Sequence, residues 1–539
     1  MYSHYFKESA NVKKSWLRNV TKFFILLAVS SALIISPTCA ASNYAEGEAL
    51  VLLKNKVGTL SVTSLSSAVV MNYIAEVAAR ASAEVVTTYL ELSAVSGEIF
   101  VLMRSEVKST KELIAELKKN PNVMSASPNF KMYAAVTEPY GVNSQQNVLW
   151  NMQRIRAPEA WAVTTGNNNI YVAVLDSGID VNHADLRPNI DMNLSRNFVN
   201  PTGSSVPVED QDYDDKSKTG HGTHIAGIIA AVGNNSNGVV GVCRNTKLIA
   251  LRVMNADNWA YHSKIVAAIN YIVKLLDDPG LKIAALNLST AGWHDWTPSD
   301  AKETMLWRAL RTLDQRNSIV IVVAAGNESS QIGAPATIDY PGVYKKDYYC
   351  YPASYVGIYN MIVVGAIDPS NDAESNSNWS TNSVHLVAPG DHIYSTLPAA
   401  IAPSGYGRYG GTSKAAPHVA GAVALVAAVS PDLTASEIRD VLFQSANSRI
   451  NPETSGVIII NDRPVTINPQ NIPTRTLSKY GLLDVGRAVA LAVGAPDPTP
   501  PPTNGGGDGG GGGCNAGIGI GILILIPVLW NIRKIRKIR

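Results

Sequence analysis

Short continuous apolar runs recur through the central and C-terminal parts of the chain, with segments of helical periodicity between them. Five such runs are Tyr171–Leu175, Leu248–Val253, Ile283–Leu288, Ile319–Ala324 and Met361–Val364. Their apolar positions do not alternate with polar ones, which is typical of strands buried on both faces of a parallel sheet. Helical patterns lie at Ser263–Leu276 and Thr304–Gln315. Residues 140–494 are therefore predicted to form an α/β three-layer sandwich with a mostly parallel central sheet.

A different pattern occupies residues 46–136. Three short runs have strand character, namely Glu48–Leu53, Ile99–Met103 and Val123–Ala126. Thr110–Lys119 has helical periodicity, and the Asn-Pro-Asn sequence that follows it predicts a break. This mixture predicts a small α+β domain ahead of the sandwich.

The first 41 residues have the composition of an export signal. Basic residues precede an apolar run, Phe23–Ile35, and small residues at Ala40 and Ala41 suit cleavage there. The run has about 13 residues, fewer than the roughly 20 that span a membrane. We expect a signal peptide over residues 1–41. A permanent anchor and a lipoprotein attached through Cys39 are the alternatives.

The chain ends in a Pro- and Gly-rich linker, residues 495–513, followed by residues 514–539. The last segment has Cys514, an apolar run from Ala516 to Ile532 and a basic end, and basic residues stay on the cytoplasmic side of a membrane. It resembles the tripartite sorting tails of bacterial surface proteins, in their Cys-containing (Synerg-CTERM-like) form. We expect attachment to the membrane or cell surface, with a plain single-span anchor as the alternative.

Composition narrows the class of protein. A net charge of +2 over 539 residues argues against a general nucleic-acid binder. Four cysteines are too few for a disulfide scaffold, and none has the CxxC spacing of a zinc or thioredoxin-like site. Cys243 and Cys350 could form a disulfide or remain buried thiols, because their separation in space cannot be read from the sequence.

Three segments combine a reactive side chain with small neighbours. Asp176 ends a predicted strand in VAVLDSGID, where sites gather in open α/β sheets. His221 lies in GHGTHIAG, and Ser413 opens a predicted helix in GTSKAAPHVAG, where free N–H groups can hold an anion. A serine hydroxyl needs a base to take its proton, and the base needs an acid to fix its tautomer. These three residues meet that need.

The three segments, in this order, resemble the signature segments of the subtilisin family, and the similarity extends over most of Tyr140–Val493. The resemblance implies a serine endopeptidase that hydrolyses peptide bonds through an acyl-enzyme, by the mechanism already known for subtilisin. Ser413 would attack, His221 would transfer the proton and Asp176 would orient His221. The segment VVAAGNE resembles the family's oxyanion-hole region and implies Asn327 as a donor beside the Ser413 N–H.

The stretch ELIAELKKNPNVMSASPNFKM resembles the end of inhibitor-type subtilase propeptides, whose last segment occupies the active site before release. The resemblance implies that residues 46–136 are a propeptide, acting as chaperone and inhibitor of its own enzyme. The mature chain would then begin between Ala134 and Asn147. An ordinary accessory domain is the alternative.

Two positions depart from the family's pattern. Lys414 stands where the family usually has Met directly after the serine. It could point to solvent and favour acidic residues beyond the scissile bond, or impair turnover, and it removes a thioether that oxidation would convert to sulfoxide. Ser289-Thr290-Ala291, followed by Gly292, replaces the usual Ser-Leu-Gly, which lines the cleft and pairs with extended substrate. The primary pocket could therefore be narrowed or reshaped.

Asp185 and the Asn-rich turn after it resemble the family's high-affinity calcium site. An acid, an amide side chain and backbone carbonyls suit a hard cation. The resemblance implies Ca²⁺ as a structural ion and assigns its ligands to the side chains of Asp185 and Asn235 and the carbonyls of Gly233, Asn237 and Val239. A plain Asn-rich loop is the alternative.

The remaining candidates have simpler interpretations. The acidic run Glu209–Asp215 could bind another ion or be a solvated loop. His224 and His418 are expected to be structural, and no organic cofactor is expected.

We expect an exported, monomeric, bacterial enzyme that acts on polypeptides. A surface binding protein on an inactive subtilase scaffold is the alternative from another class, supported only by Lys414 and Ala291. A non-proteolytic acyl hydrolase is a third possibility, but no Gly-x-Ser-x-Gly elbow surrounds Ser413.

Overall fold

The computed structural model describes residues 43–55, 61–135, 137–140, 149–202, 204–236, 238–340, 343–370, 376–447, 457–460, 463–466, 477–495 and 497. All of them belong to one compact unit, Met1–Pro498. The predicted signal peptide, nearly all of the linker and the C-terminal tail lie outside the described residues.

A parallel sheet of eight strands forms the centre of the α/β body, which we define as residues 149–495. In spatial order the strands are β21 (Gly481–Leu482), β16 (Leu386–Pro389), β15 (Met361–Ile367), β12 (Val320–Ala324), β10 (Lys282–Leu288), β6 (Ile170–Asp176), β8 (Lys247–Arg252) and β7 (Arg196–Asn197). Every neighbouring pair is parallel. Each of the five apolar runs is a strand of this sheet, so the predicted sandwich is confirmed.

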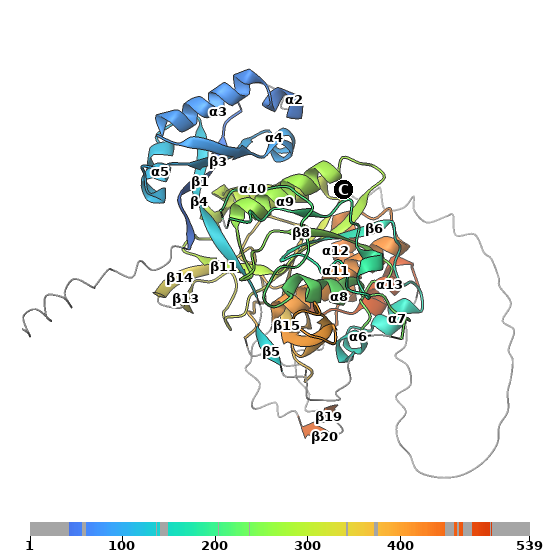
Figure 1. The fold of residues 1–539 in the computed structure, drawn as a ribbon. Helices are drawn as coiled ribbons and strands as arrows, with labels where there is room; N and C mark the ends of the chain where they lie inside the picture. The colour runs from blue at the N-terminus through green and yellow to red at the C-terminus, as the bar shows by residue number, and fades with distance from the viewer. Residues whose placement is uncertain are drawn as a thin grey trace, which may run out of the picture. The chain divides into compact units, whose positions relative to one another are not determined.

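Helices cover both faces of the sheet (Figure 1). α8 (His221–Ala230) and α11 (Thr412–Val429) lie on one face, and α9 (His262–Leu275) and α10 (Met305–Arg316) on the other. Shorter helices complete the body: α6 (Trp150–Arg154), α7 (Ala157–Trp161), η1 (Arg187–Asn189), η2 (Asp300–Glu303), α12 (Ala435–Ser445) and α13 (Val485–Ala492). Among the described helices only α11 is long and apolar enough to cross a membrane, and 89% of it is buried inside the protein, so it is a core helix.

The N-terminal subdomain, residues 44–134, is an antiparallel sheet with helices. Its strands follow the order β2 (Glu84–Thr88), β3 (Ile99–Arg104), β1 (Tyr44–Leu53) and β4 (Val123–Ala134). Its helices are α2 (Val62–Leu65), α3 (Ala68–Arg80), α4 (Leu90–Ser96) and α5 (Thr110–Leu117). α5 begins at a capping box, in which Ser109 and Glu112 bond each other's backbone N–H groups. The predicted mixed α+β architecture is present.

Both faces of the two central strands of the N-terminal sheet, β1 and β3, are buried, which explains why these strands read as continuous apolar runs. Val51 and Val101 pack beneath α3 and α5. Leu50, Phe100 and Leu102 point the other way, into the core of the α/β body, where β1 contacts α10 and α4 contacts α9. A strand with one wet face would alternate apolar and polar residues. The subdomain thus covers the body with an apolar face.

Strand β4 is much longer than predicted and connects the two parts of the protein. The sequence predicted a strand over Val123–Ala126, but β4 continues to Ala134. Its last residues lie between two short strands of the body, β9 (Trp259–Tyr261) and β11 (Thr290–His294), and are antiparallel to both. Beyond β11 the sheet continues with β14 (Val343–Tyr351) and β13 (Ala336–Tyr340). The extra length comes from strand partners supplied by the body.

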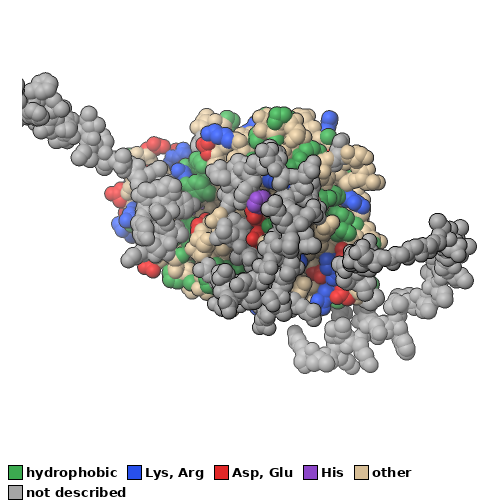
Figure 2. Space-filling view, turned by 90° about the horizontal axis from the view of Figure 1, so that it is seen from below, with side chains coloured by type: hydrophobic (Ala, Val, Ile, Leu, Met, Phe, Trp, Pro, Cys, Tyr) green, Lys and Arg blue, Asp and Glu red, His purple; other side chains and the backbone are tan. Residues whose placement is uncertain are grey.

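Two smaller sheets remain. One contains β17 (Ile393–Thr396), β18 (Tyr406–Gly410) and β5 (Thr137–Tyr140), and the other β19 (Val457–Ile460) and β20 (Arg463–Thr466). On the face shown in Figure 2, basic and acidic side chains are interspersed among the described residues, as the small net charge suggests.

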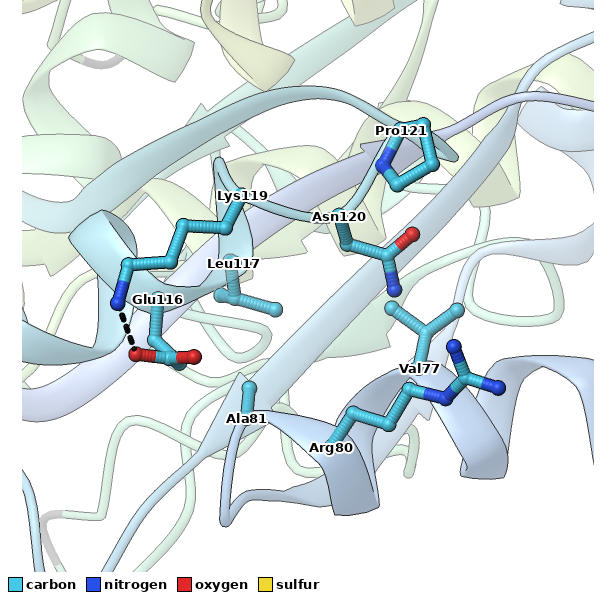
Figure 3. A pocket seen from close by; sticks show the side chains of 8 residues that line it. All are labelled: Val77, Arg80, Ala81, Glu116, Leu117, Lys119, Asn120 and Pro121. Atoms are coloured by element: carbon cyan, nitrogen blue, oxygen red, sulfur yellow. Dashed lines mark hydrogen bonds and ion pairs between the residues drawn. The ribbon is translucent and has the colours of Figure 1, made fainter.

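A surface pocket of about 210 Å³ lies on the N-terminal subdomain, between α3 and the end of α5 (Figure 3). Its polar rim includes Arg80 and an ion pair between Glu116 and Lys119. None of the predicted site residues lines it, and we assign it no function.

Candidate active site

Asp176 and His221 meet at the carboxyl end of the central sheet. Asp176 is the last residue of β6 and is fully buried. Its Oδ1 atom accepts the Ser177 N–H at 2.8 Å and lies 2.7 Å from Nδ1 of His221. His221 is the first residue of α8, and its N-cap Gly220 has a φ of 68°, which favours glycine. The carboxylate thus fixes the imidazole with its Nε2 atom pointing away from Asp176.

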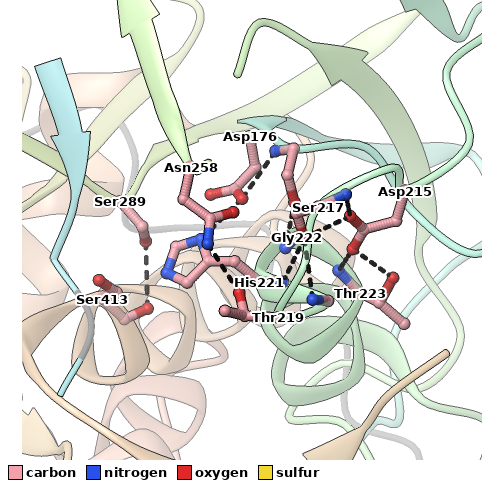
Figure 4. A network of polar contacts seen from close by, with 12 residues as sticks. Asp176, Asp215, Ser217, Thr219, His221, Gly222, Thr223, Asn258, Ser289 and Ser413 are labelled. Atoms are coloured by element: carbon pink, nitrogen blue, oxygen red, sulfur yellow. Dashed lines mark hydrogen bonds and ion pairs between the residues drawn. The ribbon is translucent and has the colours of Figure 1, made fainter. Parts of the chain in front are cut away.

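A second carboxylate anchors the first turn of α8. Asp215 accepts hydrogen bonds from the backbone N–H and hydroxyl of Thr223 at 3.1 and 2.7 Å, and from those of Ser217 at 3.0 and 2.8 Å. The Ser217 hydroxyl in turn accepts the N–H groups of Gly220 and His221. This network, drawn in Figure 4, holds the backbone from which His221 projects. The sequence analysis missed it, because an acid in a run of acids gives no sign of burial.

Ser413 lies in the first turn of α11, fully buried. The N-cap residue of α11, Gly411, has a φ of 104°. A Cβ atom at this position would lie 2.6 Å from both the Ala135 carbonyl oxygen and Nδ2 of Asn327. Only glycine therefore fits this position. In the view of Figure 4 the His221 ring lies between Asp176 and Ser413.

The Ser413 hydroxyl donates a hydrogen bond to the carbonyl oxygen of Ala135, the residue directly after β4. The backbone of this segment is held on both sides. Ala134 donates to the Asn258 carbonyl at 2.8 Å, and Ala135 donates to the Ser289 carbonyl at 3.4 Å. The end of β4 therefore occupies the cleft as an extended peptide, with one carbonyl at the serine.

Asn327 lies beside the same carbonyl. Its Oδ1 atom accepts the backbone N–H and the hydroxyl of Thr412, both at 2.9 Å, which fixes the orientation of the amide. Its Nδ2 atom is buried without a hydrogen-bond partner among the described residues. A donor held in this way is available to a negative charge that develops on a neighbouring oxygen.

The four residues 289–292, predicted to bind substrate, lie beside the end of β4 and Ser413. Thr290 and Ala291 pair with Ala134 and Tyr133 of β4, and the Ser289 hydroxyl donates to the Ser413 carbonyl at 3.1 Å. A Cβ atom on Gly292 would lie 3.2 Å from the Lys131 carbonyl oxygen. This segment therefore binds the backbone of an extended chain.

His221 is electrostatically poised between opposing influences. Burial lowers its pKa, Asp176 raises it, and Lys414 lowers it again. The Nε2 atom has no hydrogen-bond partner among the described residues, since the Ser413 hydroxyl points to Ala135. A neutral imidazole with a free Nε2 lone pair is the form that can accept a proton.

Lys414 does not point to solvent, so the expectation of an exposed cation is wrong. The side chain is fully buried, and Nζ lies 5.4 Å from the centre of the Tyr409 ring with no hydrogen-bond partner among the described residues. Burial lowers its pKa from the ordinary value of 10.5 to about 7, although Asp176 and Asp215 oppose that fall. The side chain that follows Ser413 in α11 faces the protein interior. The sequence around Lys414 does not show this, because the direction depends on how α11 packs.

The two histidines that were predicted to be structural, His224 and His418, both have hydrogen-bond partners inside the protein. Nε2 of His224 lies 3.1 Å from the Ile393 carbonyl and 3.2 Å from the Gly407 carbonyl. His418 bonds the Lys414 carbonyl through Nδ1 and accepts the Asn151 amide at Nε2. Both interpretations as structural residues agree with these contacts.

Asp185 and Asn235 lie side by side, and the calcium assignment stays a prediction. Nδ2 of Asn235 donates to Oδ1 of the buried Asp185 at 2.6 Å, while Tyr406 and the Val239 N–H donate to Oδ2 at 2.8 and 3.4 Å. No lysine, arginine or histidine forms an ion pair with Asp185 among the described residues. Asn237 lies outside the described residues. The Tyr406 contact was not predicted, because this residue is 221 positions from Asp185 in the chain.

The acidic run has partners of its own. Asp212 pairs with Lys216 and Arg252, and Asp214 pairs with Lys216. No cluster of three metal-binding His, Cys, Asp or Glu side chains occurs in the described part of the chain. Because the half-buried Asp215 is bonded to the first turn of α8, the run is not simply a solvated loop.

Cys243 and Cys350 are free buried thiols, which answers the question that the sequence left open. Cys350 donates to the Ala325 carbonyl at 3.5 Å, whereas the nearest acceptor of Cys243 is the Thr165 carbonyl at 4.0 Å. Burial raises the pKa of both thiols, that of Cys243 to about 12. Neither is a reactive thiolate.

Comparison with known proteins agrees with this geometry. A family model described as "Subtilase family" matches residues 167–479. Subtilisin E of Bacillus subtilis (strain 168) is 34% identical over 349 residues, which are 65% of this chain and 76% of that protein. The thermophilic serine proteinase of Bacillus sp. (strain AK1) is 31% identical over 342 residues, covering 64% and 72%. A solved protease structure from Pseudoalteromonas arctica covers 66% of this chain and 100% of its own, with 24% identity and a TM-score of 0.48.

Proposed function

Since the chain belongs to the subtilase family and is a serine-type endopeptidase, we propose that it is made as a precursor that cleaves itself after Ala135. One observation carries this proposal: the Ser413 hydroxyl lies on the Ala135 carbonyl while β4 fills the cleft between β9 and β11. After release of the N-terminal subdomain, the same cleft would accept polypeptide substrates.

In the proposed reaction, Oγ of Ser413 attacks the carbonyl carbon of Ala135 and Nε2 of His221 takes the hydroxyl proton. Asp176 holds the other ring nitrogen and stabilises the imidazolium that forms. The new oxyanion receives hydrogen bonds from Nδ2 of Asn327 and the Ser413 N–H. The existing contact at Asn327 supports this role, because the amide is already anchored by Thr412.

Collapse of this intermediate breaks the bond between Ala135 and Val136. The departing amine of Val136 takes the proton from His221, and Ala135 stays on Ser413 as an ester. Water then loses a proton to His221 and attacks the ester. His221 returns that proton to Oγ of Ser413 as the ester bond breaks, and Ala135 leaves with a free carboxylate. The pairing of β5 with β18, downstream of this bond, supports a bound chain on both sides of the cut.

Residues 46–136 would act as the propeptide, both chaperone and inhibitor. Its interface with the body supports this role, because it combines an apolar face with a buried polar network. Glu48, only 2% exposed, accepts Arg104 at 2.7 Å and Asn129 at 2.8 Å within the subdomain, and the Ser205 hydroxyl of the body also donates to it. An interface of this kind would outlast the first cut.

We assign Ca²⁺ a structural role at Asp185. A buried carboxylate without a cationic partner fits a cation there, because burial of an unpaired charge is costly. Asp185, Asn235 with its amide oxygen turned inward, and the carbonyls of Gly233, Asn237 and Val239 would hold the ion. The ion would fix this loop, and it takes no part in the reaction.

Export also belongs to the proposal. The signal peptide over residues 1–41 and the tail over 514–539 would place a monomeric enzyme outside a bacterial cell, attached through the tail. This rests on composition alone, and detergent-dependent recovery that is lost after deletion of 514–539 would test it.

The decisive experiment is mass spectrometry of the purified precursor, as wild type and as Ser413→Ala, after incubation with calcium. We expect the wild type to yield a new N-terminus at Val136 and the Ala variant to stay intact. Ser404→Ala, a change at an exposed serine, is the matched control and should process normally. A rate of cutting that is independent of protein concentration would identify the step as intramolecular.

Two results would contradict the proposal. A folded wild type that stays intact would exclude self-processing. Cleavage of Ser413→Ala at the same rate would show that another group or a contaminating protease makes the cut. Limited proteolysis that removes the N-terminal subdomain uncovers Ser413. Labelling of Ser413 by a serine-reactive fluorophosphonate after this step separates an inactive enzyme from one that merely fails to process itself.

A further inference from the structure

The side chains of β4 alternate between two environments in the cleft. Phe130 and Met132 are buried, while Lys131 and Tyr133 are only half-buried. This is the alternation of an extended chain with one face against a wall. Counting back from Ala135 as the first residue before the cut, Phe130 is the sixth.

Phe130 sits among aromatic rings that the α/β body supplies. Its ring centre lies 4.1 Å from that of His294, 4.6 Å from that of Trp296 and 5.9 Å from that of His262. The Trp296 contact is edge-to-face, at an interplanar angle of 82°. Ring separations of about 4.5 to 7 Å are favourable for aromatic pairs, and the Trp296 and His262 contacts lie in that range. Tyr44, 5.8 Å away, comes from the N-terminal subdomain.

The aromatic wall around Phe130, formed by His294, Trp296 and His262, is held in place by contacts inside the α/β body. The His294 ring stacks on Tyr351 at 5.9 Å and 16°, and the Tyr351 hydroxyl donates to the Trp296 carbonyl at 2.8 Å. Tyr355 packs behind Tyr351 at 4.8 Å. These contacts do not involve the subdomain, so they remain when it leaves. The wall is a preformed feature of the mature enzyme.

The wall also has a definite chemistry. His262 is fully buried, and burial lowers its pKa to about 3, so its ring is neutral at physiological pH. His294 is buried to 1% exposure. Neutral rings around a dry position favour an apolar aromatic side chain and disfavour a charged one.

We propose that His294, Trp296 and His262 form a subsite for an aromatic side chain six residues before the scissile bond, and that the enzyme selects polypeptides with Phe at that position. This inference rests on the proposed function, because it takes Ala135 as the residue before the cut. It extends substrate recognition well beyond the residues next to the reacting bond.

The test compares two peptides on the mature enzyme. One has the chain's own sequence from Asn129 to Glu138, and the other has Ala in place of the Phe that corresponds to Phe130. We expect kcat/KM for the Phe peptide to be about 10- to 100-fold higher, the range expected for full burial of a large apolar side chain. His294→Ala should reduce this preference to less than threefold, and His294→Phe should restore it.

Controls separate recognition from damage. Asp295→Ala changes an exposed neighbour of His294 and should keep the wild-type preference. The folding of His294→Ala is checked by its Tm and by labelling of Ser413 with fluorophosphonate, both of which should match the wild type. If His294→Ala does not fold, Trp296→Ala replaces it, and the two peptides on the wild type still decide.

Equal cleavage of the two peptides by an active wild type would overturn the subsite, as would an equal loss on both peptides in a folded His294→Ala enzyme. Failure of the proposed function looks different: neither peptide would be cut, and fluorophosphonate would not label Ser413.

Discussion

Replacing Lys414 by Met should stabilise the protein at neutral and acidic pH. The lysine is fully buried next to the nucleophile, and its ammonium form would have no hydrogen-bond acceptor among the described residues. The Tyr409 ring, 5.4 Å away, is the one favourable partner shown for the charge, while Asp176 and Asp215 act at longer range. The charge of Lys414 in turn disfavours protonation of two nearby histidines, because it lowers the pKa of His221 and of His224. Methionine fills a similar volume without any charge.

The magnitude follows from the pKa of the amine. Lys414 falls from 10.5 to about 7 on folding, and each pKa unit corresponds to about 1.4 kcal/mol. The buried ammonium therefore costs roughly 5 kcal/mol wherever both states are protonated, that is, below pH 7. Between pH 7 and 10.5 the unfolded chain keeps a proton that the folded protein has lost. Stability consequently rises with pH across that window and levels off above it.

The assay is thermal unfolding of two precursors from pH 6 to 10.5, both with Ser413→Ala to prevent autolysis. One keeps Lys414 and the other carries Lys414→Met. Unfolding the subdomain and body of the precursor, roughly 440 residues, changes the entropy by about 0.9 kcal/mol/K, so 5 kcal/mol corresponds to about 5 °C. We expect the Met variant to melt about 5 °C higher at pH 6, and the gap to close as pH rises above 7. Other titrating groups are shared by the two proteins and cancel in the difference.

Parallel melting curves would refute this reasoning. If the difference in Tm between the two proteins stayed constant within 2 °C from pH 6 to 10.5, Lys414 would titrate with an ordinary pKa, and its ammonium group would have access to water. Lys414→Gln serves as a second neutral variant. Like the Met variant, it should lack the pH dependence that Lys414 causes. Agreement between the two variants would exclude an effect of the thioether itself.

Three further outcomes test other contacts. Asn327→Ala should lower kcat about 100- to 1000-fold, the magnitude known from subtilisin itself, while leaving fluorophosphonate labelling detectable; an unchanged kcat would remove Asn327 from the oxyanion site. Glu48→Ala should weaken retention of the cleaved subdomain about 100-fold, because the buried Ser205 hydroxyl of the body loses its charged acceptor, and gel filtration with an activity assay follows its release. Chelation of Ca²⁺ should lower Tm in the wild type but not in Asp185→Ala; equal responses in both would place the ion elsewhere.

The sequence predicted the body of the fold well, because its information is local. A run such as Ile319–Ala324 has no polar position, and burial on both faces accommodates that. The small residues before Ser413 likewise indicate a close approach of backbone, and Gly411 confirms it through its φ of 104°. The predicted acid, base and nucleophile come together because each follows a strand or opens a helix at the same edge of the sheet.

What the sequence could not give depends on partners distant in the chain. Lys414 reads as a surface residue until α11 is seen to bury every side of its first turns. Asp215 and its neighbours read alike, yet only Asp215 lies within reach of Thr223. The length of β4 is set by β9 and β11, more than a hundred residues away. Residue type and hydrophobic periodicity predict whether a segment prefers helix or strand. Contacts with residues distant in the chain determine whether a charged side chain is buried and where a strand ends.

The apolar face of the N-terminal sheet connects folding with inhibition. Leu50, Leu52, Phe100 and Leu102 are buried only because the α/β body covers them. A free subdomain would expose them as a contiguous apolar patch, which is unfavourable for a domain of this size. The subdomain is therefore most stable on the body, where β4 also blocks the cleft. Cutting after Ala135 breaks one peptide bond but leaves this face buried, so activity should appear only when the subdomain itself is removed.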